Sequence, residues 1–356
     1  MAARPHGDTG KEVILNVQVL RGVAALLVIF VHIDKLLAFL GARPFGEGGV
    51  DIFFVISGFI MVYTTIDTGV SSRAFVADRI ARIVPPYWAI TMAVFIVALV
   101  APTLLQATHV NWHELFKSLA FIPFVKSNGL VQPILFVGWT LNYEMFFYLL
   151  FATGLLFPSR RWGIAAVVSC LVVLAVIGFV IKPHGVLARF YTNSVILDFV
   201  LGILIGTFYR DLPAHANTVW KSITLFAVLC SFAAIVVFPF VVPDISRFAG
   251  SAIPAGLIVG GALMLERWGW KVRSSVLLKV GAASFSIYLI HPFVTQIAQK
   301  SAALLRPTPP MALLILVVTL VLVCIVGVLV QRFLERPLSG AARRLLKTRR
   351  LNPRVA

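Results

Sequence analysis

Residues 20–32, with the sequence LRGVAALLVIFVH, form an apolar run that carries Arg21 near its start and His32 at its end. Ionisable side chains inside a membrane span are costly and are usually kept for a function. Eleven residues separate the two, so they share one helix face and lie roughly 16 Å apart along the axis. That distance is about half of the hydrocarbon thickness of a bilayer. The stretch therefore predicts a membrane helix with a fixed cation and a titratable base on one face, along a path for reaction or transport.

The composition extends this prediction to the whole chain. Its 356 residues are 60% hydrophobic and 13% charged, and a mean hydropathy of +0.95 is far above that of soluble domains. The apolar segments long enough to cross a bilayer as a helix are residues 13–37, 48–66, 83–101, 134–157, 162–181, 190–209, 219–240, 248–265, 276–298 and 311–334. We therefore expect an all-α polytopic integral membrane protein with about ten transmembrane helices.

The basic residues indicate how the chain is oriented. Most of its 31 lysines and arginines fall on one side when the predicted segments are traced alternately across the membrane. By the positive-inside rule that side, which holds both termini, is cytoplasmic. We expect a cytoplasmic segment 1–12, a membrane domain 13–335 and a basic cytoplasmic tail 336–356. The tail is interpreted as an anchor on anionic lipid, and the net charge of +17 is not taken to indicate nucleic acid.

Metal and cofactor sites are not expected. Cys170, Cys230 and Cys324 lie in apolar segments without paired spacing, which is typical of small buried side chains. The seven histidines form no metal-ligand spacing. The first apolar segment carries Arg, His and Asp, so it is not expected to be a cleaved signal peptide. We predict no metal and no permanently bound cofactor.

One group of ionisable residues falls on the predicted cytoplasmic side: Arg21, Arg79, Arg82 and Glu335. Arg79 and Arg82, in DRIARIVPPYW, are three residues apart and would project from one face of a helix. Two guanidinium groups held together suit a phosphate or pyrophosphate group. Flanking charges that only orient the helix remain an alternative for the same pair.

A second group falls on the opposite side: His32, Asp34, Asp51, Glu144 and His291. These residues come from four predicted helices at similar depth, so we expect them to converge on one cavity. Each also has a structural alternative, such as helix capping for Asp51 or a proline kink for His291. In the ninth segment, Ser284, Tyr288 and His291 form one polar stripe, which is expected to face protein or water.

A secondary transporter is the alternative function. Buried His, Asp and Glu also occur in proton relays of transporters, and Asp198 in NSVILDFVLG would suit such a relay. Against this, the acidic residues are not concentrated at mid-membrane, and paired Gly/Pro-broken segments are not evident.

Seven segments together resemble the membrane acyltransferase 3 family, most closely its exopolysaccharide-production acetyltransferase branch. In order, they are LRGVAALLVIFVH, GGVDIFFVISGF, DRIARIVPPYW, GWTLNYEMFFY, ILDFVLG, SFSIYLIHPF and LERPL. The resemblance implies a multi-pass enzyme of the bacterial inner membrane. Such an enzyme takes an acyl group, here expected to be acetyl, from cytoplasmic acyl-CoA. It passes the group to a sugar hydroxyl of an exopolysaccharide, lipopolysaccharide or lipid-linked glycan.

The resemblance also implies roles for particular residues. The family's first-span Arg and His fall on Arg21 and His32, and its Arg-x-x-Arg on Arg79 and Arg82. We expect the three arginines to hold the phosphates of acetyl-CoA, which is the donor substrate. Where the family often has a basic residue before the pair, this chain has Asp78, which lowers the local positive charge.

His32 would act either as a general base on the sugar hydroxyl or as a nucleophile that forms an acyl-imidazole. Glu144 or Asp51 would orient the imidazole or bind acceptor hydroxyls, as a carboxylate partner does for a catalytic histidine. His291 and Tyr288 are assigned to the acceptor pocket. The remaining acids, Asp198 and Glu335, are expected to pair with arginines of neighbouring helices.

Overall fold

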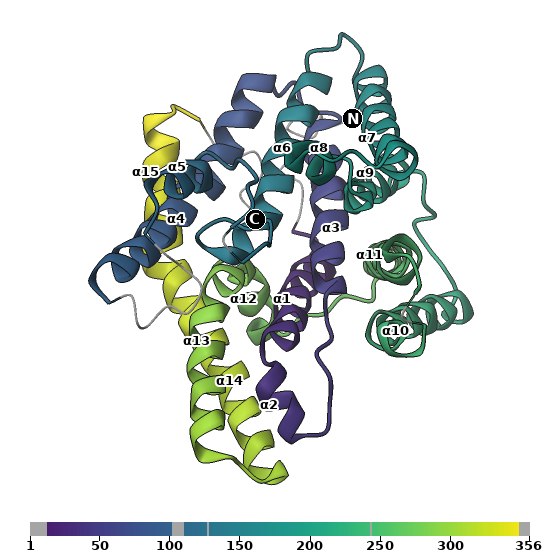
Figure 1. The fold of residues 1–356 in the computed structure, drawn as a ribbon. Coiled ribbons are helices and arrows are strands. Elements are labelled where there is room, and N and C mark those ends of the chain that lie inside the picture. The colour runs from purple at the N-terminus through teal and green to yellow at the C-terminus, as the bar shows by residue number, and fades with distance from the viewer. Residues whose placement is uncertain (1–12, 102–109, 127, 243, 349–356) are drawn as a thin grey trace.

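The computed structural model describes residues 13–101, 110–126, 128–242 and 244–348, and within these ranges it contains helices and no strand (Figure 1). The first half consists of α1 Leu15–Ile29, η1 Phe30–His32, α2 Asp34–Phe39, α3 Gly48–Thr65, α4 Ser72–Val100, α5 Trp112–Leu119, η3 Phe136–Gly138, α6 Trp139–Gly154 and α7 Arg160–Ile181. The second half consists of α8 Val186–Tyr191, η4 Ser194–Ile196, α9 Leu197–Phe208, α10 Thr218–Val241, η5 Phe248–Ala252, α11 Ile253–Arg267, α12 Ser275–Ala282, α13 Ser284–Leu305, α14 Pro309–Val330, η6 Gln331–Glu335 and α15 Arg336–Leu345.

The prediction of an all-helical polytopic membrane protein is confirmed, whereas the predicted count of about ten spans is not. In the described residues, eight helical segments are long and apolar enough to cross a membrane, or nine when α12 and α13, which meet at 77°, count as one span. The remaining predicted segment, 134–157, contains α6, which has only 16 residues. The third predicted segment begins too late, because α4 starts at Ser72 and continues through Pro85 and Pro86.

Helix α3 forms the centre of the molecule (Figure 1). Of its membrane window 89% is buried, against 17% for α7 and for α10, whose apolar side chains face outward as a lipid-exposed surface requires. Two glycines bring α3 and α9 together: a Cβ on Gly58 would meet the carbonyl oxygen of Phe199, and one on Gly202 would meet that of Val55. Only small residues permit such close approach between helix backbones.

The first predicted helix is interrupted. α1 ends at Ile29, a 3₁₀ turn carries the chain through His32, and Ile33 leaves helical geometry at φ −131° and ψ 34° before α2 begins. The break frees backbone groups that a continuous helix would have satisfied. Gln299 of α13 pairs with two of them, because its Nε2 donates to the His32 carbonyl at 2.8 Å and its Oε1 accepts from the Lys35 amide at 3.0 Å. The first predicted segment, 13–37, therefore contains a candidate membrane span, Leu15–His32, and the start of a separate short helix.

The start of α1 is held from another part of the chain. The Glu266 carboxylate of α11 accepts the backbone N–H groups of Leu15 at 2.8 Å and Asn16 at 2.7 Å. A negative charge at a helix N-terminus also interacts favourably with the helix dipole. α1 is thereby anchored at one end by α11 and near its other end by α13.

The C-terminal tail continues from the membrane domain as a helix. A π-helical turn, Gln331–Glu335, connects α14 to α15, and α15 lies alongside the first part of α4 (Figure 1). Of the predicted tail, residues 336–345 are therefore part of the folded domain, whereas residues 349–356 and the predicted segment 1–12 lie outside the described residues.

Candidate active site

A cavity of about 690 Å³, including its open mouth, lies among α1, α3, α4, α6 and α13. Its polar lining comprises Arg21, Ser57, Arg82, Thr140, Glu144, Tyr148, Ser284 and Tyr288. Its apolar lining comprises Val50, Phe53, Phe54, Ile56, Ile60, Met61, Ile83, Leu141 and Phe285. A mostly apolar cavity with a few convergent polar groups is typical of a small-molecule site.

Two arginines contribute positive charge to this cavity. Arg21 of α1 is 5% exposed, and its Nη1 atom has no hydrogen-bond partner in the described part of the chain. Arg82 of α4 lies close enough to interact electrostatically with Arg21. A buried guanidinium with an unused donor is costly unless a ligand or counter-charge completes it. The pair can therefore bind an anionic group within the membrane domain.

Glu144 supplies the carboxylate in the same cavity. It accepts hydrogen bonds from the hydroxyl of Tyr148, one turn further along α6, and from the hydroxyl of Ser57 at 3.3 Å. It also interacts electrostatically with Arg21. The sequence predicts Glu144 at the depth of the histidines, on the opposite side, whereas the structure places it beside the arginines. The cavity thus combines two cations with one carboxylate that is already oriented by two hydroxyls.

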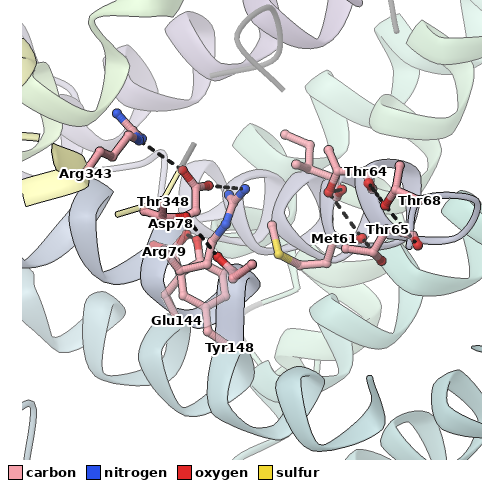
Figure 2. Close-up of polar contacts among 12 residues, drawn as sticks. Met61, Thr64, Thr65, Thr68, Asp78, Arg79, Glu144, Tyr148, Arg343 and Thr348 are labelled. Atoms are coloured by element: carbon pink, nitrogen blue, oxygen red, sulfur yellow. Dashed lines mark hydrogen bonds and ion pairs between the residues drawn. The ribbon is translucent and has the colours of Figure 1, made fainter. Parts of the chain in front are cut away.

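The two arginines of the predicted Arg79–Arg82 pair have different surroundings in the structure. Arg82 lines the cavity, whereas Arg79 is buried beside it and forms an ion pair of 3.0 Å with Asp78. The guanidinium of Arg79 also lies 5.9 Å from the ring centre of Tyr148. Asp78 in turn accepts a hydrogen bond of 3.0 Å from Arg343 of α15 (Figure 2). The sequence motif therefore places one arginine in the cavity and uses the other in a network beside it.

The two predicted histidines meet. The rings of His32 and His291 stack with centroids 5.3 Å apart and an angle of 28° between their planes. His32 is half-buried and also contacts the edge of Phe136, whereas His291 is completely buried. His291 Nδ1 lies 2.8 Å from the Tyr288 carbonyl oxygen, so this nitrogen carries the proton and Nε2 is left as a free acceptor. The close contact between residues far apart in sequence was expected from their similar depth.

Tyr288 connects this histidine pair with the cavity. Its ring lies 5.7 Å from that of His291, and its hydroxyl donates to the Val137 carbonyl and accepts from the Thr140 hydroxyl. Tyr288 is itself part of the cavity lining, as is Ser284 of the predicted polar stripe. The two histidines are not part of that lining among the described residues. His291 contacts the ring of Tyr288, and His32 stacks on His291.

Asp51 belongs to a separate buried cluster. It is completely buried and accepts two hydrogen bonds from Arg247, at 3.2 Å to Nε and 2.8 Å to Nη2. Asp198 is equally buried and interacts electrostatically with both of them, although no hydrogen bond of ordinary geometry reaches its two oxygens in the described part. The expected convergence of Asp51 on His32 is therefore not found. Arg247 was not predicted from the sequence. Its position directly before the apolar segment 248–265 is the signal that could have marked it as a partner for Asp51 and Asp198.

The other predicted acids have local roles. Glu335 accepts a hydrogen bond of 2.5 Å from Ser286 and interacts electrostatically with Arg21, in line with the expected pairing to an arginine of another helix. Asp34 is exposed at the start of α2. Neither side chain lines the cavity.

The comparisons with known proteins agree with this picture. Residues 14–328 match the model of a family described as an acyltransferase domain, the acyltransferase 3 family, and the chain belongs to this family. The exopolysaccharide production protein ExoZ of Rhizobium meliloti (strain 1021) is 36% identical over 84% of this chain and 92% of its own. The acyltransferase MdmB of Streptomyces mycarofaciens is 27% identical over 79% of each chain. A protein of Staphylococcus aureus (strain COL), described as a candidate O-acetyltransferase, is 24% identical over 76% of this chain and 49% of its own. No solved structure matches the chain.

Proposed function

We propose that this membrane acyltransferase moves an acyl group, acetyl in particular, from acyl-CoA to a sugar hydroxyl of an exopolysaccharide or related glycan. The observation that carries the proposal is the cavity that joins the buried Arg21, the half-buried Arg82 and one oriented carboxylate, next to a stacked histidine pair that contacts Tyr288 through His291. The similarity to an exopolysaccharide production protein supports a glycan acceptor. The distribution of basic residues supports cytoplasmic termini. The apolar helices and the bacterial relatives support a place in the bacterial inner membrane.

The donor has a charged end and a thin arm that ends in the thioester. Arg21 and Arg82 bind the phosphates of the donor, because planar guanidinium groups match phosphate oxygens. Arg79, which is paired with Asp78, lies beside the same end without lining the cavity. The apolar side chains of the cavity, such as Phe53 and Phe285, accommodate the pantetheine arm. Binding therefore directs the thioester from the arginine end towards Tyr288.

The chemical step needs a base for the incoming hydroxyl. The thioester C–S bond breaks, a new ester C–O bond forms, and the proton of the hydroxyl ends on the departing thiol. His32 transfers this proton as a general base, or first takes the acyl group itself as an acyl-imidazole. His291, stacked on His32, and the hydroxyl of Tyr288 contribute to the acceptor pocket. Glu144, the carboxylate of the cavity, binds acceptor hydroxyls.

Acyl transfer can be measured in proteoliposomes as release of free CoA thiol and as label from acetyl-CoA that enters an isolated glycan fraction. His32→Ala is expected to lower kcat by about 10²- to 10⁴-fold, the range for loss of a general base. The double variant Arg21→Ala/Arg82→Ala is expected to raise KM for acetyl-CoA. His215→Ala serves as a control, because His215 is an exposed loop histidine. Activity of His32→Ala equal to that of His215→Ala would contradict the proposed chemistry.

The same preparation tests the transporter alternative. A secondary transporter would accumulate labelled solute in response to a proton gradient, without thiol release and without a covalent acyl product. Membership in an acyltransferase family favours the enzyme. Uptake of labelled solute without thiol release would favour the transporter over the enzyme.

A further inference from the structure

Helix α15 is bonded to the part of α4 that supplies both arginines of the Arg-x-x-Arg motif. Arg343 Nε donates to one oxygen of Asp78 at 3.0 Å, and Arg79 pairs with the other oxygen at 3.0 Å (Figure 2). One helical turn earlier in α15, the Ser339 hydroxyl donates to the carbonyl oxygen of Arg82 at 3.4 Å. α15 therefore contacts the motif at two successive turns.

The charges in this contact are largely removed from water. The side chains of Asp78, Arg79 and Arg343 are 2%, 6% and 17% exposed. Charges in such surroundings are weakly screened and influence each other, and a nearby ligand, over longer distances than at a surface. Asp78 alone would neutralise Arg79, so that the pair would add no net charge. Arg343 restores one net positive charge to the group formed by Asp78, Arg79 and Arg343.

The group also reaches the cavity through direct contacts. The guanidinium of Arg79 lies over the ring of Tyr148, whose hydroxyl donates to Glu144 (Figure 2). Glu144 lines the cavity, and so does Arg82, one turn along α4 from Arg79. A change at Arg343 therefore has a physical path to the site through Asp78.

We propose that α15 contributes to the donor site. Arg343 offsets the charge of Asp78, so that the end of the cavity lined by Arg21 and Arg82 keeps its positive charge for the phosphates of the donor. This inference rests on the proposed use of acyl-CoA. It assigns Arg343 as a positioning residue and gives the tail a role in addition to contact with lipid. The adjacent Arg344 is exposed and lies about 100° further around the helix, so it provides a matched control.

The test compares KM and kcat for acetyl-CoA in four variants. Arg343→Ala is expected to raise KM about three- to tenfold, the usual range for a residue that acts through a network, with little change in kcat. Arg344→Ala is expected to leave both constants unchanged. Asp78→Asn/Arg343→Ala restores the net charge of the wild type and is expected to return KM close to its original value. Asp78→Asn alone adds one positive charge and is expected to give a KM below that of the wild type.

If the tail is only attached mechanically, the KM values follow a different order, in which the KM of the double variant is no lower than that of Arg343→Ala. That order, or equal effects of Arg343→Ala and Arg344→Ala, would overturn the inference. If Arg343→Ala fails to fold, the comparison of Asp78→Asn with Asp78→Asn/Arg343→Ala decides, because KM must be higher in the double variant. Failure of the proposed function is distinguishable, since the wild-type protein would then release no thiol from acetyl-CoA.

Discussion

Replacement of Arg247 provides a sharp test of how the buried charges are divided between structure and chemistry. Arg247→Met removes the cation that donates two hydrogen bonds to Asp51 and leaves Asp51 and Asp198 together in the interior. Asp51→Asn is the milder change, because Asp198 remains as a counter-charge for Arg247. Both variants alter the same cluster, so their difference isolates the effect of an uncompensated buried charge.

The expected magnitudes follow from burial. Breaking a buried ion pair by removal of one partner costs about 3–5 kcal/mol. The Arg247 side chain is 32% exposed, so the lower end, about 3 kcal/mol, applies to Arg247→Met. Asp51→Asn retains an acceptor oxygen and is expected to cost about 1 kcal/mol. At about 2.1 cal/mol/K per residue, the unfolding entropy of a 356-residue chain corresponds to ~1.3 °C per kcal/mol, so Arg247→Met should lower the melting midpoint by about 4 °C.

The assay is thermal unfolding of the purified protein in detergent, together with acyl transfer below the melting midpoint. Asp51→Asn is expected to retain most of its kcat, because Asp51 contacts Arg247 and not the histidine pair. Equal midpoints for the two variants would refute the charge argument. Normal stability with loss of kcat in Asp51→Asn would place Asp51 in the chemistry.

Three further predictions concern the break in the first helix, the helix contact at the centre and the oriented carboxylate. Gln299→Ala is expected to lower kcat several-fold by releasing the backbone on both sides of the break, whereas Gln296→Ala, one turn away on the same helix, should have no effect on kinetics. Gly202→Ala is expected to destabilise the protein by about 1–3 kcal/mol through overpacking, measured by thermal unfolding, whereas Gly256→Ala has room for its methyl group and should not. Tyr148→Phe removes a hydrogen bond to the cavity carboxylate and is expected to reduce kcat/KM for the acceptor about tenfold. An unchanged kcat/KM would show that the Glu144 carboxylate does not need the hydrogen bond from Tyr148.

The membrane helices were predictable because apolar length is a local property of the sequence. Every predicted segment contains helix in the structure, although the segment around α6 is shorter than expected. The break after His32 was not predictable in the same way. The groups that stabilise it come from Gln299, more than two hundred residues later, and nothing in the local sequence marks this contact.

The site was predicted only in part. The sequence indicates the depth of each residue in the membrane but not the direction in which its side chain points. At 100° per residue, Ser57 and Ile60, which line the cavity, lie about 180–240° around α3 from Asp51. Asp51 consequently faces Arg247, although its depth is similar to that of the histidines. By contrast, Ser284 and Tyr288 are one turn apart on one face, and both line the cavity as the polar stripe indicated.

The most direct test of the central claim is mass spectrometry of the surface glycans of cells that produce wild-type protein, His32→Ala protein or none. We expect an ester-linked acyl group, removed by mild alkali, only in cells with the wild-type protein. The His32→Ala protein must be present in the membrane at the wild-type level for the comparison to count. Acylated glycan at the wild-type level in cells with His32→Ala protein would contradict the assignment of His32 to the chemistry.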